Sequence, residues 1–393
     1  MAPVLRPFEP ADDEACKLLE VTASQFQELG GLIKAAITHH KTFDAKVRQF
    51  ENSLLLVALE GSQLFGVIAV GFKRVWIHGA TRLCGYVFDL RIAGSHQGRG
   101  LGKWLAAEAE ARCAQLGAEI LYLSVNRTNL VARKLYSSLG WSFASRRILF
   151  ARPLLLPRSS PPGVAVRFMA MEDAVDLVTK YYAARPLGPP RAECLRLFTS
   201  PLYLGTLTCE DGLGSRASIS LWHGSAFSGF KFLRVFLPVS AWRHLAPCLL
   251  VAMLYFMSTK ILLVASTFIS LPLWGRAMLL PPLLLSVSAV SYLIYWLRTR
   301  KEFRCRVFAP VVEGPAWQPL MLALYTKACN EGRNRGFALL FLNEDANSEV
   351  GECIAGKGSH SPTEFWQKVL APHAFSGQVG PWPSDSFFDP RDF

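Results

Sequence analysis

The alternation of apolar and polar residues in the first part of the chain predicts short strands and helices in turn. Residues 53–59 and 65–72 are short apolar runs rich in β-formers, and EGSQL (60–64) between them is typical of a hairpin turn. The run YVFDLRI (86–92) predicts another strand. It leads directly into a glycine-rich segment, AGSHQGRGLG (93–102). The pattern therefore predicts a strand followed by a glycine loop.

After the glycine loop the spacing of apolar residues changes to that of a helix. Trp104, Leu105 and Leu116 lie at helical spacing within 103–116, and Gly117 follows as a stop signal. The next predicted elements are a strand at 119–125, a helical stretch at 126–139 and a strand at 141–150. This order predicts an α/β (α+β) domain over residues 1–151.

A change in composition separates this domain from the rest. RPLLLPRSSPPG (152–163) predicts a linker, because residues before proline disfavour helix. We expect a second lobe in two parts, 164–244 and 298–393, around the apolar segment 245–297.

The two lobes share a weak internal repeat. Arg6 is followed six positions later by Asp12, as Arg167 is by Asp173. LYLSVNRTN (121–129) also has an echo in LLFLNEDAN (339–347). The repeat is either a coincidence or the trace of a duplicated fold whose second copy has diverged.

Two long apolar runs dominate the segment between the parts of the second lobe. Residues 277–297 carry no charge over 21 positions, and residues 245–271 carry only Lys260. About 20 apolar residues span a bilayer core, and PLWGR (272–276) suits a tight turn, so we expect a membrane-inserted helical hairpin. A buried helical pair in a soluble domain and a re-entrant hairpin are the alternatives.

Basic residues on both sides of the hairpin predict its orientation. They are Arg234, Arg243 and His244 before it, and Arg298, Arg300, Lys301, Arg304 and Arg306 after it. Under the positive-inside rule both flanks face the cytosol. We therefore expect an endomembrane protein, at the endoplasmic reticulum, with both lobes cytosolic and the lipid bilayer as a partner.

Composition narrows the class further. The 393 residues are 51% hydrophobic and 18% charged, which excludes a disulfide-stapled mini-protein and intrinsic disorder. Nine cysteines occur without a C-x-x-C pair, so we expect reduced structural thiols and no metal site. The N-terminus lacks the apolar run of a secretory signal. The net charge is 42 − 30 = +12. The basic residues form no patch with interleaved aromatic residues, so a nucleic-acid partner is disfavoured.

The glycine loop carries the clearest chemical signal. Gly98, Gly100 and Gly102 permit close approach of backbone to ligand, and the first amides of the following helix point outward. With Arg99 and Lys103 nearby, the loop predicts an anion site suited to a pyrophosphate. The spacing matches neither the Rossmann nor the Walker loop, and a plain tight turn is the alternative.

Two linked motifs resemble the GNAT acetyltransferase superfamily. Gln97-Gly98-Arg99-Gly100-Leu101-Gly102 matches Q/R-x-x-G-x-G/A, its acetyl-CoA loop. Asn129-x-x-Ala132-x-x-Leu135-Tyr136, followed by Leu139-Gly140-Trp141, resembles its second signature. The resemblance implies a mixed, mostly antiparallel sheet flanked by helices, acetyl-CoA as co-substrate and no metal. For the whole chain we expect a GNAT fold followed by a divergent GNAT-like lobe that carries the apolar hairpin.

A closer resemblance is spread over the whole chain. AVRFMAMEDAVDL (165–177), SPLYLGT (200–206), VVEGP (311–315) and SFFDPRDF (386–393) are similar to segments of the plant HOOKLESS-type N-acetyltransferases. The apolar hairpin departs from that family's pattern. VVEGP has one glycine where Q-x-x-G-x-G would stand, so we do not expect the second lobe to bind acetyl-CoA in the usual way.

The resemblance implies roles for particular residues. The backbone of Leu90, Arg91 and Ile92 would pair with the pantetheine arm, and the amides of 97–102 would hold the pyrophosphate. Asn129 would contact the pantetheine or order its loop. Tyr136 would protonate the departing thiolate, which a phenol can do at short range. A packed helix residue is the alternative for Tyr136.

The implied reaction is direct attack of a neutral amine on the thioester, which needs a base or an ordered water. Tyr86, Asp89 and His96 are candidates by position, and His39 and His40 lie where many such enzymes build the acceptor site. The acceptor is open between a small amine, an amino acid, a protein N-terminus and a lysine. The competing interpretation is a non-catalytic GNAT-fold membrane scaffold.

Overall fold

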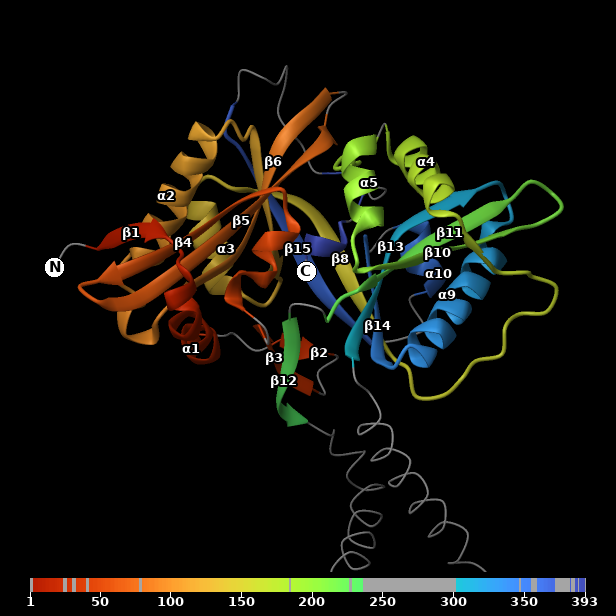
Figure 1. The fold of residues 1–393 in the computed structure, drawn as a ribbon, viewed down its shortest axis with the longest axis horizontal. Coiled ribbons are helices and arrows are strands. Elements are labelled where there is room, and N and C mark those ends of the chain that lie inside the picture. The colour runs from red at the N-terminus through yellow and green to blue at the C-terminus, as the bar shows by residue number, and fades with distance from the viewer. Residues whose placement is uncertain are drawn as a thin grey trace, which may run out of the picture.

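Figure 1 shows the computed structural model of the protein. It describes residues 3–23, 27–29, 33–39, 42–77, 80–183, 185–225, 228–235, 302–345, 348–354, 359–371, 382, 386–387 and 389–392. Among these residues no helix combines the length and apolar character needed to cross a membrane. The predicted hairpin, 245–297, lies outside the described residues and stays a prediction.

The first half of the chain contains the elements that the sequence predicted. Its strands are β1 Val4–Pro7, β2 Gln27–Leu29, β3 Ile33–His39, β4 Asn52–Glu60, β5 Gln63–Ile77, β6 Ala80–Ile92, β7 Ile120–Asn126 and β8 Ser142–Pro153. Its helices are α1 Asp13–Ala23, α2 Leu101–Gln115 and α3 Leu130–Ser138, with short 3-10 turns η1 Pro10–Asp12, η2 Phe43–Ala45, η3 Val47–Gln49 and η4 Gly94–His96. The predicted β-hairpin at 53–72, the glycine loop and the two helices predicted at 103–116 and 126–139 are confirmed. Strand β5 is longer than predicted, because it continues beyond residue 72.

The second half has a comparable succession of elements. Its strands are β9 Arg167–Met169, β10 Tyr203–Glu210, β11 Arg216–His223, β12 Ser228–Val235, β13 Glu302–Glu313, β14 Phe337–Asp345 and β15 Ser359–Val369. Its helices are α4 Met171–Tyr182, α5 Arg191–Thr199, α9 Trp317–Asn334 and α10 Glu349–Ile354, and a 3-10 turn, η7 Pro390–Asp392, lies near the end.

Both halves contribute to one mixed sheet. Its 12 strands follow the order β1-β4-β5-β6-β7-β15-β8-β14-β13-β11-β10-β9. Neighbours are antiparallel except β6–β7 and β13–β14, so the predicted mixed, mostly antiparallel sheet is confirmed. Figure 1 shows α2 and α3 beside the strands of the first half and α9 and α10 beside those of the second.

The halves are interleaved at the centre of this sheet. Strand β15, from the second half, lies between β7 and β8 of the first half. Strand β8 in turn pairs with β14, and its last two residues, Arg152 and Pro153, face Leu340 and Leu339. The predicted linker at 152–163 therefore begins inside a strand. The last strand of each half pairs with strands of the other half, so the boundary that the sequence predicted near residue 151 does not divide the sheet.

The same backbone irregularity occurs once in each half. In β6 the pairing with β5 shifts at Asp89, a non-glycine residue with φ +52°. In β13 the pairing with β11 shifts at Ala309, with φ +49°. These are β-bulges, which bend a strand away from its neighbour. The parallel pairing of β6 with β7 ends at Val87, and that of β13 with β14 ends at Val307.

The repeated Arg–Asp pairs differ in what they bond. Arg6 grips Asp12 with two hydrogen bonds of 2.7 and 2.8 Å at the start of α1. Arg167 bonds instead to Glu210 on β10, at 2.8 Å. The two arginines therefore stand at the start of equivalent strand–helix units but make different contacts.

A buried ion network fastens the C-terminal residues to both halves. Lys73 of β5 lies 2.9 Å from Asp389, which also pairs with Arg391 at 2.6 Å. Arg391 reaches Glu193 of α5 as well, and all four side chains are at least 96% buried. Burial alone would raise the pKa of Asp389, but Arg391 and Lys73 hold it below its usual value. The carboxylate is thus ionised and fully paired.

We predict that Asp389→Ala lowers the free energy of unfolding by about 3–5 kcal/mol, because it removes the buried carboxylate that pairs with both Lys73 and Arg391. The matched control is Glu51→Ala, which removes the exposed ion pair of Glu51 with Arg196 on α5 and should cost less than about 1 kcal/mol. Urea unfolding measures both. Equal losses for the two variants would show that the buried network has no special weight.

Candidate active site

A cavity of about 630 Å³ opens where β6 and β7 diverge. It is bounded by the bulge in β6, the glycine loop and the facing sides of α2 and α3. The predicted site residues that line it are Leu90, Arg91, Ile92, Gln97, Gly98, Gly100, Leu101, Gly102, Asn129 and Tyr136. The structure therefore brings together residues that lie up to 46 positions apart in the sequence.

The glycine loop presents uncapped helix amides to this cavity. Gly98 and Gly100 have φ values of +76° and +78°, a region that favours glycine. Gly100 is the N-cap of α2 and has no side chain with which to satisfy the first amides of the helix. Lys103, in the first turn, also lines the cavity. The site is suited to an anion such as a phosphate.

Side chains behind the loop hold it in place. Gln97 donates its side-chain amide to the carbonyl of Ile92 at 2.9 Å. His96 stacks on Phe65, with 4.8 Å between ring centroids, and lies 3.2 Å from Glu60. Arg99 bonds to the same Glu60 at 3.3 Å and is the one predicted site residue that does not line the cavity. The hydrogen bond from Arg99, and to a smaller extent the one from His96, lowers the pKa of the Glu60 carboxyl.

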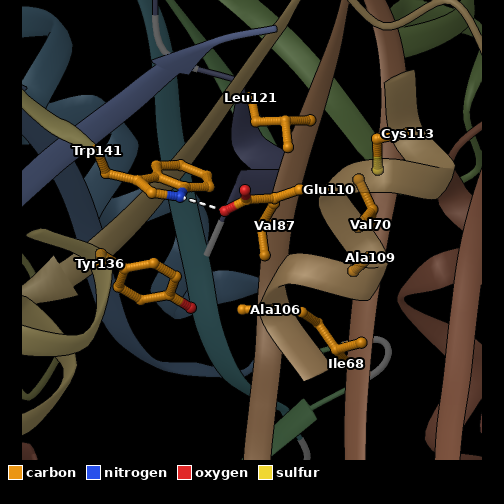
Figure 2. Close-up of a pocket in the computed structure, with 10 residues that line it drawn as sticks. All are labelled: Ile68, Val70, Val87, Ala106, Ala109, Glu110, Cys113, Leu121, Tyr136 and Trp141. Atoms are coloured by element: carbon orange, nitrogen blue, oxygen red, sulfur yellow. Dashed lines mark hydrogen bonds between the residues drawn. The ribbon is translucent and has the colours of Figure 1, made fainter. Parts of the chain in front are cut away.

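Helix α3 carries the two remaining predicted residues. Asn129 accepts a hydrogen bond from the amide of Ala132 at 2.9 Å, so its side chain caps the helix. Tyr136 is 93% buried, and Figure 2 shows it beside Trp141, with 5.2 Å between ring centroids. Burial, followed by the nearby Glu110, raises the pKa of Tyr136. The phenol therefore stays protonated and able to donate.

The candidate bases differ in their surroundings. Asp89 lines the cavity and accepts a hydrogen bond from Arg91 at 3.1 Å. His96 also lines it, but its two ring nitrogens lie within bonding distance of Ser95 and Glu60. Tyr86 packs in the aromatic core away from the cavity lining. His39 is described by backbone only and His40 lies outside the described residues. Geometry favours Asp89.

Sequence reasoning missed acidic residues that support this site. Glu20, only 1% exposed, accepts from Arg91 at 3.1 Å, so one guanidinium joins α1 to the bulge. Glu110 accepts from the indole of Trp141 at 2.6 Å, as the dashed line in Figure 2 shows. A signal was present for Glu20, because it shares the buried face of α1 with Cys16 and Leu19 at helical spacing.

Thiols and metal ligands play no visible part in the described residues. The described cysteines form no disulfide with one another and, apart from Cys353, are buried; they are Cys16, Cys84, Cys113, Cys194, Cys209, Cys305, Cys329 and Cys353. Cys248 lies outside the described residues. In the described part of the chain no group of three or more His, Cys, Asp or Glu side chains is placed to hold a metal ion.

Comparison with known proteins identifies the family of one domain of the chain. Residues 23–141 match the family model of the acetyltransferase (GNAT) family. No curated protein matches the chain significantly. Residues 23–141 therefore belong to a GNAT-family acetyltransferase domain.

Solved structures of low sequence identity share this fold. The GCN5-related glucosamine N-acetyltransferase region of a fungal multi-domain GH3 β-N-acetylglucosaminidase superposes with a TM-score of 0.58 at 10% identity, covering 93% of this chain and 38% of that one. A GCN5-related N-acetyltransferase from Sphaerobacter thermophilus gives a TM-score of 0.50 at 14% identity, covering 94% of this chain and 96% of that one.

We predict that Gly100→Val weakens acetyl-CoA binding at least about 10-fold, because a side chain there projects into the anion site and strains the loop. The matched control is Gly117→Val, at the end of α2 and away from the cavity. Gly117 has nearly the same φ (+81° against +78°), and a Cβ at either position meets no atom within 4 Å. Calorimetry measures affinity and thermal unfolding measures stability. Both variants should lose similar stability, and equal binding by both would refute the assignment of the loop.

Proposed function

We propose that the protein is an acetyl-CoA-dependent N-acetyltransferase that transfers the acetyl group to a primary amine. The observation that supports this most strongly is the cavity between the diverging strands β6 and β7. It combines the uncapped amides of α2, a half-buried stretch of bulged strand that lines the cavity and a protonated phenol in one site. Each feature answers a chemical need of the reaction.

Binding would use the backbone for the extended arm and the loop for the phosphates. Beyond the bulge, β6 is no longer paired with β7, so Leu90, Arg91 and Ile92 face the cavity with strand geometry. The amides from Gln97 to Gly102 and the ammonium of Lys103 would hold the pyrophosphate. Asn129 would act through its cap on α3, which shapes the wall beside the arm.

In the proposed step the amine nitrogen forms a bond to the thioester carbonyl carbon and the carbon–sulfur bond breaks. Asp89 would take the proton that the amine loses, directly or through a water. Arg91, which bonds to both Asp89 and Glu20, would hold the carboxylate of Asp89 in place. Tyr136 would give its proton to the departing thiolate. The acceptor's identity stays open among amines.

The second half would be a diverged copy of the same fold that has lost the cofactor site. Ser215 accepts from the amide of Ala316 at 3.1 Å, just before α9, where a free amide would be needed. Tyr182 donates to the carbonyl of Pro310 at 2.7 Å, beside the second bulge. Glu344 is buried in β14, and burial raises its pKa to about 7. We therefore expect one acetyl-CoA per chain.

The second half would instead wall the acceptor side. Strand β12 pairs with β3, which follows α1, and the register runs from Ser228 opposite His39 to Val235 opposite Ile33. The apolar segment 245–297 follows β12 in the sequence. We propose that it tethers the protein to the lipid bilayer of the endoplasmic reticulum, with both lobes cytosolic. The spaced similarities to the HOOKLESS-type family support an acetyltransferase lobe followed by a divergent second lobe, and the apolar segment is this chain's departure from that pattern.

The experiment that tests this function is an acceptor screen on the full chain in detergent. Small amines, amino acids, peptides with free N-termini and lysine peptides are each incubated with acetyl-CoA, and thiol release is recorded. We expect binding of one acetyl-CoA per chain and release above background with one acceptor class. Failure to bind acetyl-CoA would refute the enzyme, whereas binding without turnover would favour a scaffold.

We predict that Tyr136→Phe lowers kcat about 100-fold and leaves the Kd for acetyl-CoA nearly unchanged, because it removes a proton donor but keeps the ring. The control is Tyr325→Phe, the same change at a buried tyrosine of α9, which should leave kcat unaltered. Steady-state kinetics and calorimetry separate the two effects. Parallel loss of binding and turnover would indicate a packing role for Tyr136.

A further inference from the structure

Helix α3 is held at both ends by the C-terminal strand β15. At its N-terminal side, Arg133 lies 3.0 Å from Glu364, which is 3% exposed. The loop before the helix is also fixed, since the amide of Arg127 donates to the carbonyl of Pro362 at 3.3 Å. At the C-terminal side, Lys368 donates to the carbonyl of Leu139 at 2.7 Å. The second half therefore reaches the helix that carries Tyr136.

Lys368 makes a second contact that leads directly toward Tyr136. Its ammonium pairs with Glu110 of α2. The other oxygen of Glu110 accepts from the indole of Trp141, and the edge of that ring meets Tyr136. Lys368, Glu110 and Trp141 thus form a continuous chain of contacts from β15 to the phenol. The charged and titratable groups that face Glu110 are Lys368, Tyr136 and its own helix neighbour Cys113.

We propose that Lys368 is a positioning residue, which fixes the end of α3 and the ring of Trp141 so that Tyr136 is aligned in the cavity. This inference rests on the proposed function of Tyr136. A lysine suits the task because one ammonium can bond the helix-end carbonyl and the carboxylate together. Under this proposal, turnover at the site in the first half depends on a side chain of the second half. Lys368 lies 232 positions after Tyr136 in the sequence.

The test uses Lys368→Met, which keeps most of the stem and removes the ammonium. We expect kcat to fall about 10-fold with the Kd for acetyl-CoA within about 2-fold, because misalignment affects the chemical step more than binding. Amides of residues 130–139 should exchange hydrogen faster than in the wild type. The control is Arg82→Met, which removes a similarly buried ion pair with Glu119, the residue just before β7, without touching α3 or Glu110, and should change neither readout.

Lys368→Met leaves a partly buried carboxylate unpaired, which could unfold the domain. Lys368→Met combined with Glu110→Gln removes that charge, and it should fold while keeping both the faster exchange and the lower kcat. Wild-type exchange and wild-type kcat in the double variant would overturn the proposal. Faster exchange at unchanged kcat would also overturn it, since Lys368 would then be merely structural.

The two hypotheses fail in different ways. If the wild-type chain binds acetyl-CoA but transfers no acetyl group to any acceptor, the proposed function fails. Unchanged exchange at 130–139 in both Lys368 variants would refute the alignment of α3 whatever the activity. An active wild type with unaltered variants removes the positioning role alone.

Discussion

The separation of β6 from β7 is the constraint on which the rest of the site depends. Their parallel pairing ends at Val87, and the bulge at Asp89 bends β6 away, at the cost of a left-handed backbone at a non-glycine residue. Without this divergence the uncapped amides of α2 and the phenol of Tyr136 would face packed sheet. With it, they converge on one cavity. The Arg91 bonds to Asp89 and Glu20 stabilise the bulge from the side.

The exchange of last strands makes this opening a property of the whole chain. Because β15 lies between β7 and β8, the second half supplies the neighbour that β7 needs where it leaves β6. The equivalent divergence in the second half follows the bulge at Ala309, where Tyr182 donates to the carbonyl of Pro310 and Ser215 accepts from the amide of Ala316. The first half thus provides the proposed site and the second half supports it, although both contain a bulge with a positive φ.

Local signals in the sequence predicted most of the first half, and the resemblance to the GNAT superfamily implied most of the cavity lining. Strand alternation, glycine stops and the loop at 97–102 are short-range features, so they appear in the letters themselves. The insertion of β15 and the pairing of β12 with β3 join residues that lie far apart, and no local period encodes such pairing. The roles of Glu110 and Lys368 were missed for the same reason. In the sequence each looks like a solvent-exposed charge, because its partner lies far away along the chain.

The most direct test of the account is a crystal structure of the full chain with CoA. We expect one molecule, with its pyrophosphate at the amides of 97–102 and its thiol near Tyr136 between β6 and β7. The divergence of β13 and β14 should hold none. CoA bound at the second divergence, or a pyrophosphate away from the glycine loop, would contradict the account.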